Sequence, residues 1–286
     1  MGIVQQEQRI GIIIPTYRRA SALNKCIQSV ISGSELKCTI VVVNDGSDTK
    51  VSDLLCLNYP DCIELTSNED LWWTKSVNIG LEYLLKNGFS AAILLNDDVT
   101  VIPGFVDRML RSHRQYPKSI VISKVVDQDG MVWSQGGYAS WPFHGERHFL
   151  SHPLPSNLRR EITWSPGMGT LIPLAVVEKV GFLEERFMPQ YLSDADFGLR
   201  ATRSGCKMDL NQECVVRNDT RTTGGVSEKS RLNFSDLHFI LFNVRSPDYL
   251  KARFVFIYRH APFGLRTISF VIRLAKIFIY FIKRFH

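Results

Sequence analysis

Six cysteines are scattered through the sequence without a CxxC pair, at Cys26, Cys38, Cys56, Cys62, Cys206 and Cys214. No histidine stands beside them at the spacing of a zinc site, which argues against a structural zinc module and favours a reducing, cytosolic compartment. The first ten residues, MGIVQQEQRI, lack the basic start and the long apolar run of a secretory signal. We therefore expect a chain that is not exported.

Two nucleotide-binding signatures are missing after the first apolar run, residues 10–14. A dinucleotide-binding oxidoreductase needs GxGxxG at this point, and a nucleotidyltransferase needs a glycine-rich phosphate loop followed by a basic residue. The sequence reads PTYRRAS instead. Both of these enzyme classes are therefore disfavoured.

The composition is that of an ordinary folded protein. Of the 286 residues, 45% are hydrophobic and 22% are charged, so the chain is long enough for one large α/β domain with a small accessory piece and has no room for a long disordered region. The net charge of +6 suits anionic lipid, a diphosphate or a nucleic acid about equally well. Net charge alone therefore decides nothing about the ligand.

Strand-like and helix-like segments alternate in the first third of the chain. Four short apolar runs predict strands, at residues 10–14, 39–43, 62–66 and 91–95. Apolar residues at helical spacing predict helices over residues 21–33 and 75–87. This alternation is typical of an α/β fold with a mostly parallel central sheet and helices on both faces. Residues 133–160 have no clear period, and we interpret them as loops on the acceptor side of a site.

Polar groups directly follow three of these strands. They are residues 16–19 (TYRR), Asn44-Asp45 and residues 96–98 (NDD). Because ligands of such sheets bind beyond the carboxyl ends of the strands, we expect these three groups to meet at one edge.

Two acidic groups stand out. Asp97 and Asp98 carry oxygen ligands suited to Mg²⁺ or Mn²⁺, although Asn and Asp also favour simple solvated turns. Asp194 and Asp196 stand at a predicted helix start, where helix capping explains one carboxylate more easily than two. For each acidic group, the residues alone leave both a functional and a purely structural interpretation open.

The composition changes near the C-terminus. Residues 254–285 are strongly apolar and aromatic, and on a helix their basic residues Arg266, Arg273, Lys276, Lys283 and Arg284 fall within an arc of roughly 100°. No stretch reaches the ~20 uncharged apolar residues that a membrane span requires. We therefore predict that residues 251–286 form a basic amphipathic segment lying in the plane of an anionic membrane surface. Its density of apolar side chains argues against nucleic acid as the partner.

The order of the motifs resembles a known family. The series IIIPTYRR, VVVNDGSDT, LLNDDV, GMGTLIP and YLSDADFGLRA is similar to family-2 glycosyltransferases of the GT-A fold, from about Ile10 to about Asp219. The segment LWWTKSVNIGLE, Leu71 to Glu82, resembles the subgroup that includes rhamnosyltransferases and other O-antigen or capsule enzymes. The resemblance implies a GT-A domain over residues 1–250, followed by the C-terminal helical extension.

The same resemblance implies an activity. We expect an inverting hexosyltransferase that uses UDP, dTDP or GDP sugars with Mn²⁺ or Mg²⁺. The acceptor would be a saccharide, either free or linked to a lipid. The enzyme would serve bacterial surface polysaccharide synthesis as a peripheral protein on the inner face of the cell membrane. The alternative is a degenerate transferase domain that acts as a non-catalytic, membrane-bound scaffold or binding subunit.

The resemblance also assigns residues to the donor site. The donor-binding residues are Thr16, Tyr17, Arg19, Asp45, Lys75, Asn96, Asp97 and Gly169. Tyr17 and Asp45 would hold the base and ribose, and Lys75 would lie near the phosphates. Asn96 replaces the first Asp of the family's DxD motif, which makes Asp98 the metal ligand. Glycine at 169 would leave room for the donor sugar.

On the acceptor side, Asp194 matches the general base of the family. Asp196 would orient the acceptor or support this base, and Trp73 would stack on a sugar ring. One departure concerns the metal, because the histidine that relatives often carry after the next strand is absent from residues 215–219. Asn218 or Asp219 would ligate the metal instead, or Arg217 and Arg221 would neutralise the diphosphate directly.

Overall fold

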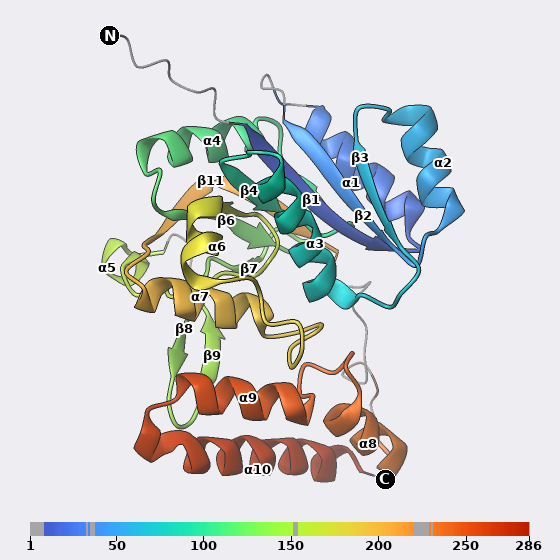
Figure 1. Cartoon of the computed structure of the whole chain (residues 1–286). Helices are drawn as coiled ribbons and strands as arrows, with labels where there is room; N and C mark the ends of the chain where they lie inside the picture. The colour runs from blue at the N-terminus through green and yellow to red at the C-terminus, as the bar shows by residue number, and fades with distance from the viewer. Residues whose placement is uncertain are drawn as a thin grey trace.

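The computed structural model describes residues 9–32, 34, 38–150, 154–219, 229 and 231–285. A mixed sheet runs through the molecule, with helices on both of its faces (Figure 1). Its strands are β1 (Ile10–Tyr17), β2 (Thr39–Asp45), β3 (Ile63–Ser67), β4 (Ala91–Leu94), β5 (Val99–Val101), β6 (Ile120–Val126), β7 (Val132–Ser134), β10 (Thr170–Pro173) and β11 (Met208–Asn218). The order across the sheet is β3-β2-β1-β4-β10-β6-β11-β5, and β7 pairs with β6.

The two halves of this sheet differ in direction. Strands β3, β2, β1 and β4 are all parallel, as the alternation of strands and helices predicts. In the other half, β10 runs antiparallel to both β4 and β6, and β5 runs antiparallel to β11. The predicted α/β class is confirmed. The sheet is mixed, and the predicted mostly parallel order holds only in the first half, because an apolar run indicates a buried strand without giving its direction.

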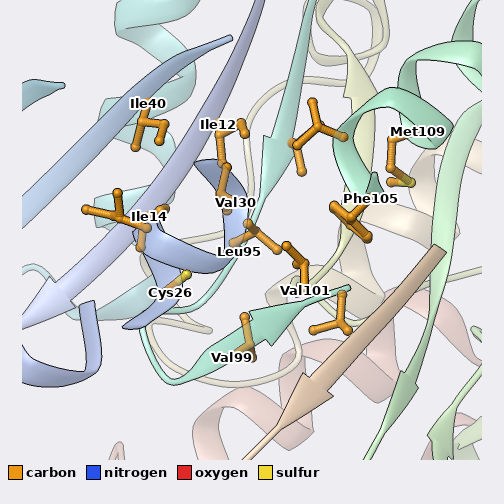
Figure 2. Close-up of a cluster of buried hydrophobic side chains, with 14 of the residues drawn as sticks. Ile12, Ile14, Cys26, Val30, Ile40, Leu95, Val99, Val101, Phe105 and Met109 are labelled. Carbon is orange, nitrogen blue, oxygen red and sulfur yellow. The ribbon is translucent and has the colours of Figure 1, made fainter. Parts of the chain in front are cut away.

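Both faces of the sheet are covered by helices. These are α1 (Ala20–Ile31), α2 (Thr49–Asn58), α3 (Trp72–Lys86), α4 (Phe105–Gln115), α6 (Leu174–Val180) and α7 (Ser193–Arg203), with the short α5 (Ser156–Arg159) at the side. Figure 2 shows one cluster, in which Ile12 and Ile14 of β1 pack with Val30 of α1 and Phe105 of α4. Ile13 points to the opposite face and joins a second cluster with α3. Strand β1 is therefore buried on both faces.

Helix α3 lies unusually close to β1 because it carries a glycine at the contact. A Cβ added at Gly80 would stand 2.6 Å from Cγ2 of Ile13, which is closer than side-chain atoms pack. This close approach fixes the position of α3, whose first turn carries Trp73 and Lys75.

Residues 133–160, predicted as loops, contain a small hairpin made of β8 (Gly137–Ser140) and β9 (Gly145–His148). The antiparallel pairing was missed because these strands are only four residues each and lack a clear alternation of apolar and polar side chains.

The C-terminal part of the chain forms α8 (Phe234–Phe242), α9 (Leu250–His260), the 3₁₀ turn η3 (Phe263–Leu265) and α10 (Arg266–Arg284). In Figure 1 this part forms the bottom of the molecule, with α9 between α7 and α10. Phe256 of α9 is fully buried in a cluster with Trp164, Leu192 and Leu199. Helix α9 therefore packs against the main body. The domain boundary at residue 250 stays a prediction. In the described residues, no helix combines the length and the apolar character needed to cross a membrane.

The packing of α9 predicts unequal effects of two substitutions in one helix. Phe256→Ala should lower the free energy of unfolding by about 3 to 5 kcal/mol, because it removes a fully buried aromatic side chain. Phe254→Ala is the matched control and should cost much less, since Phe254 is 43% exposed. Urea unfolding of the full-length variants measures both, and equal losses would show that α9 does not belong to the core.

Candidate active site

Asp97 is the buried centre of the first predicted group, at the carboxyl ends of β1 and β4. Thr16 Oγ1 donates to its Oδ2 at 2.7 Å, Arg19 Nε donates to the same oxygen at 3.0 Å, and a second Arg19 nitrogen donates to Oδ1. The Asp97 side chain is fully buried. Burial raises its pKa to about 6, although Arg19 and Thr16 act to lower it. The structure thus brings three predicted donor residues into one hydrogen-bonded group.

Arg19 also binds the neighbouring carboxylate. Its Nη1 lies 3.0 Å from Oδ2 of Asp98, whose side chain is only 5% exposed, while 42% of the Arg19 side chain is accessible. The guanidinium therefore bridges Asp97 and Asp98 and keeps one side open toward solvent. Arg19, predicted to bind the donor, lies at the predicted metal ligand as well.

Trp73 connects this group to the glycine turn before β10. Its indole Nε1–H donates to Oδ1 of Asn96 at 2.9 Å. Its ring lies so close to Gly167 that an added Cβ there would stand 2.2 Å away. Trp73, predicted to stack on the acceptor, therefore links two parts of the site and is half-buried.

Tyr17 and Asp45 end two neighbouring strands and are opposite each other in the register of β1 and β2. Asp45 is buried and accepts a hydrogen bond from the N–H of Leu71 at 3.1 Å. Burial raises the pKa of Asp45, and the hydrogen bond from the Leu71 N–H lowers it by a smaller amount. Tyr17 is 38% exposed, so its ring has a free surface on which a base can stack. Lys75 lies at the rim and pairs with Glu69 at 2.9 Å.

Asp194 is the first acidic residue of α7, and it bridges this helix to the glycine turn. Its Oδ2 accepts from the N–H of Gly167 at 3.1 Å, and its Oδ1 accepts from the N–H of Ala195 at 2.8 Å. The N-cap of α7 is Leu192, which has a left-handed φ of 74° and no side-chain cap. Asp194 therefore does not act as the N-cap, which was the structural interpretation of this residue. Burial raises its pKa to about 6, while the two N–H donors lower it.

Asp196 is enclosed by side chains of α7 and α9, so it has no free surface for an acceptor; the predicted alternative, support of the base, stays a prediction. Its side chain is fully buried. Arg259 and the His260 Nε2 nitrogen each lie 2.8 Å from its Oδ1, and Arg200 Nε donates to Oδ2 at 2.8 Å. Burial raises the pKa of this carboxyl, but His260, Arg200 and Arg259 together lower it to about 2. Asp196 therefore ties α7 to α9 as a permanent anion.

The partners in α9 were missed because no local pattern connects them to α7. Arg259 and His260 stand more than sixty residues after Asp196, and in sequence they belong to the segment assigned to the membrane. Arg259 also donates to Glu184 at 2.7 Å, so the same cation holds the loop before α7. A second contact missed from sequence joins Thr74 Oγ1 to Ser193 Oγ at 2.7 Å.

Gly169 has a different physical role from the one predicted. Its φ is +74°, and an added Cβ would stand 2.1 Å from Oγ of Ser123 and 2.5 Å from Cγ2 of Val216. The neighbouring strands β6 and β11 therefore leave no room for a side chain at position 169. This packing explains the glycine without the predicted need to leave room for a donor sugar.

The alternative metal ligands lie beside Asp98. Asn218 pairs with Val99 in the register of β11 and β5, and the N–H of Asp219 lies 3.5 Å from the backbone oxygen of Asp98. Arg217 is exposed at the same strand end, and Arg221 lies outside the described residues. Within the described chain, no three His, Cys, Asp or Glu side chains gather as a metal cluster. A single carboxylate with nearby oxygens still fits Mg²⁺, which commonly takes one or two carboxylates and completes its shell with phosphate and water.

This arrangement of an acidic strand end, a glycine turn and an acidic helix start agrees with the comparison with known families. Residues 11–168, more than half of the chain, match the family model described as glycosyl transferase family 2. The chain belongs to glycosyltransferase family 2.

The family relatives are distant and longer than this chain. An uncharacterised glycosyltransferase of Rickettsia bellii is 24% identical over 188 residues, which cover 62% of this chain and 25% of the relative. One of Rickettsia typhi is 22% identical over 224 residues, covering 75% of this chain and 65% of the relative. The matched part thus spans between a quarter and about two thirds of these relatives.

Two solved glycosyltransferase structures share the fold. The crystal structure of GalNAc-T7 with UDP, GalNAc and Mn²⁺ has a TM-score of 0.61 at 14% identity, covering 75% of this chain and 44% of that chain. The crystal structure of S. aureus TarS also has a TM-score of 0.61, at 12% identity, covering 96% of this chain and 54% of that chain. At this identity the likeness concerns the GT-A fold. The rhamnosyltransferase and O-antigen subgroup stays a prediction.

The two acids of α7 should respond differently to loss of charge. Asp196→Asn should lower the free energy of unfolding by about 3 kcal/mol near neutral pH, because the partly buried guanidinium groups of Arg200 and Arg259 lose their counter-charge. Since the folded pKa of Asp196 is about 2, its stabilisation persists until the pH falls below its ordinary value of 3.8.

Asp194→Asn should destabilise the protein less than Asp196→Asn near neutral pH. A folded pKa of about 6 means that burial disfavours the charged form, so removing the charge offsets part of the loss of one of the two oxygens that accept backbone N–H groups. This offset should shrink as the pH falls from ~7.5 to ~5, where the wild-type carboxyl becomes protonated in the folded state. Urea unfolding at both pH values measures the two effects. Equal destabilisation by the two variants would contradict the assigned roles.

Proposed function

We propose that the protein is an inverting hexosyltransferase that moves a sugar from a nucleotide-diphosphate donor to a saccharide acceptor. The observation that carries the proposal is a continuous line of contacts. Asp194 binds the N–H of Gly167, Gly167 lies against Trp73, and Trp73 donates to Asn96 of the acidic strand end. A candidate base and a candidate diphosphate site are therefore connected through one glycine turn and Trp73.

Asp194 has the environment of a general base. Its pKa of about 6 leaves it ionised at neutral pH and makes it a stronger proton acceptor than an ordinary aspartate, which suits general base catalysis. In the proposed step, the acceptor hydroxyl gives its proton to Asp194 as its oxygen forms a bond to the anomeric carbon. The bond from this carbon to the diphosphate oxygen breaks, and the nucleoside diphosphate leaves. One such displacement inverts the anomeric configuration.

The donor would lie along the carboxyl ends of β1, β2 and β4. Tyr17 offers a ring surface to the base, and Asp45 offers a carboxylate oxygen to the base or ribose. Asp98 would hold Mn²⁺ or Mg²⁺, with Asn218 or Asp219 nearby, and the cation would neutralise the charge of the leaving diphosphate. Support for this donor chemistry comes from the GalNAc-T7 structure, which contains UDP and Mn²⁺.

Arg19 would keep the acidic pair in place. Through its contacts with both carboxylates, it neutralises part of their charge and fixes their orientation before the donor arrives. Its accessible side also lies where a diphosphate would approach Asp98. Arg19 therefore complements any cation at this position.

For the setting, we propose synthesis of a bacterial surface polysaccharide at the inner face of the cell membrane, with an acceptor that a lipid carries. The supports are the resemblance of Leu71–Glu82 to O-antigen and capsule enzymes and the bacterial origin of the relatives. We expect no nucleic-acid partner.

The donor site is tested by calorimetric titration with UDP, dTDP and GDP, each with Mn²⁺ and with EDTA. We expect micromolar binding of one nucleotide, which EDTA and Asp98→Ala should both abolish. Asp129→Ala, in an exposed turn between β6 and β7, is the matched control and should bind as wild type does. Binding that survives both EDTA and Asp98→Ala would favour neutralisation of the diphosphate by arginine alone.

The scaffold alternative is tested by turnover. Asp194→Asn should lower the rate of sugar transfer by roughly 10²- to 10⁴-fold, the usual contribution of a general base, and should keep nucleotide affinity within about twofold of wild type. Asn is suitable because its amide oxygen can still accept from Gly167. A wild-type protein that binds nucleotide but transfers no sugar, with any donor tried, would favour the scaffold.

A further inference from the structure

Helix α10 turns its charged side chains toward the protein. Arg273 Nε donates to Oδ1 of Asp248 at 2.8 Å, and Lys276 donates to the backbone oxygen of Phe143. Part of the basic arc of this helix therefore attaches α10 to the protein body.

The opposite face of α10 is apolar and uncovered. It consists of Ile268 (50% exposed), Val271 (55%), Phe278 (43%), Ile279 (52%) and Ile282 (67%). At about 100° per residue, these positions fall on one side of the helix. We name them the α10 outer face. A surface helix of a soluble domain normally turns such a stripe inward, so this orientation needs a partner.

The apolar surface continues beyond both ends of this face. Phe263, in the turn before α10, is 84% exposed, and the Arg266 guanidinium lies 5.4 Å from the centre of its ring. At the other end, the ring of Phe234 in α8 is 71% exposed and lies 4.9 Å from the ring of Phe285. Aromatic rings therefore extend the α10 outer face at both ends of the helix.

The charges around this face select the partner. Residues 266–284 contain five basic residues and no acidic residue; Arg273 is paired with Asp248 in the body, whereas Lys283 is exposed beside Ile282. A second copy packed on the same face would bring the exposed lysines of two basic helices together, because a two-fold interface pairs like with like. An anionic lipid surface offers hydrocarbon for the apolar side chains and negative headgroups for the border.

We infer that the α10 outer face docks in the headgroup layer of an anionic bilayer, with the helix axis in the plane of the membrane. Figure 1 shows α10 as the outermost element at the bottom of the molecule, so a flat surface can reach it. Helix α9 connects it to the site, because Arg259 and His260 of α9 hold Asp196 of α7. Docking would therefore fix the orientation of the helix that carries Asp194 relative to the bilayer. If the proposed function holds, this favours an acceptor carried in the same membrane.

Vesicle co-flotation of the full-length protein tests this inference without an activity assay. Wild type should bind vesicles of phosphatidylcholine with phosphatidylglycerol, and should bind pure phosphatidylcholine more weakly. Val271→Glu with Ile282→Glu should lower binding to the anionic vesicles at least about tenfold, because each change places an acid on the docking face. Leu57→Glu is the matched control, since Leu57 is 79% exposed on α2, away from α10, and it should bind as wild type does.

Three results would overturn the inference. They are wild type that binds neither vesicle, a double variant that binds as well as wild type, or equal losses in the double variant and the Leu57→Glu control. Sedimentation equilibrium tests a second copy as the partner. If wild type is a dimer, the double variant is a monomer and wild type binds no vesicles, the α10 outer face is an interface between two copies. Circular dichroism confirms that both variants are folded. Because no sugar is transferred in these measurements, failure here removes support for the membrane setting and leaves the proposed sugar transfer intact.

Discussion

The carboxylate of Asp196 is the interaction on which the arrangement of the whole second half depends. It is fully buried and accepts hydrogen bonds from Arg200 in its own helix and from two residues of α9. Because a buried anion without partners is very costly, these contacts hold α7 and α9 in their relative position, together with the packing of Phe256 against Leu192 and Leu199. Through α7 the same contact orients Asp194, and through α9 it attaches the C-terminal helices to the site.

The surroundings of Asp194 and Asp196 shift the pKa values of these two neighbouring acids in opposite directions. Asp196 faces cations and stays ionised, with a pKa of about 2. Asp194, two residues earlier, receives only backbone N–H groups, so burial dominates and raises its pKa to about 6. This contrast separates a structural anion from a residue able to exchange a proton near neutral pH. The sequence SDAD shows two carboxylates but not which partners reach each of them.

Much of the fold follows from the sequence, because apolar β-branched runs predict buried strands and the polar residues after them must meet at one edge. This reasoning placed Thr16, Asp97 and Asp45 correctly at the carboxyl ends of β1, β4 and β2. It did not predict that β10 is antiparallel, since an apolar run has no direction. The role of Gly169 was also hidden, because its neighbours Ser123 and Val216 lie far away in the chain.

The C-terminal segment shows a further limit. Its helical period and its basic arc are visible in the sequence, but whether the arc faces the body or the solvent depends on Asp248 and on the backbone oxygen of Phe143. The inclusion of α9 in the core likewise depends on Phe256 meeting Trp164 and Leu199. Such contacts between distant segments decide domain boundaries, and neither composition nor periodicity contains them.

The most direct test of Asp194 as the base is the pH dependence of kcat/KM for sugar transfer, with nucleotide affinity measured in parallel. With a pKa of about 6, the wild-type rate should be constant above that pH and fall about tenfold for each unit below it, as the base becomes protonated. Asp194→Asn should show a low rate without this inflection, while both proteins bind nucleotide equally well. A variant that keeps a near wild-type rate and the same inflection would contradict the assignment of Asp194 as the base.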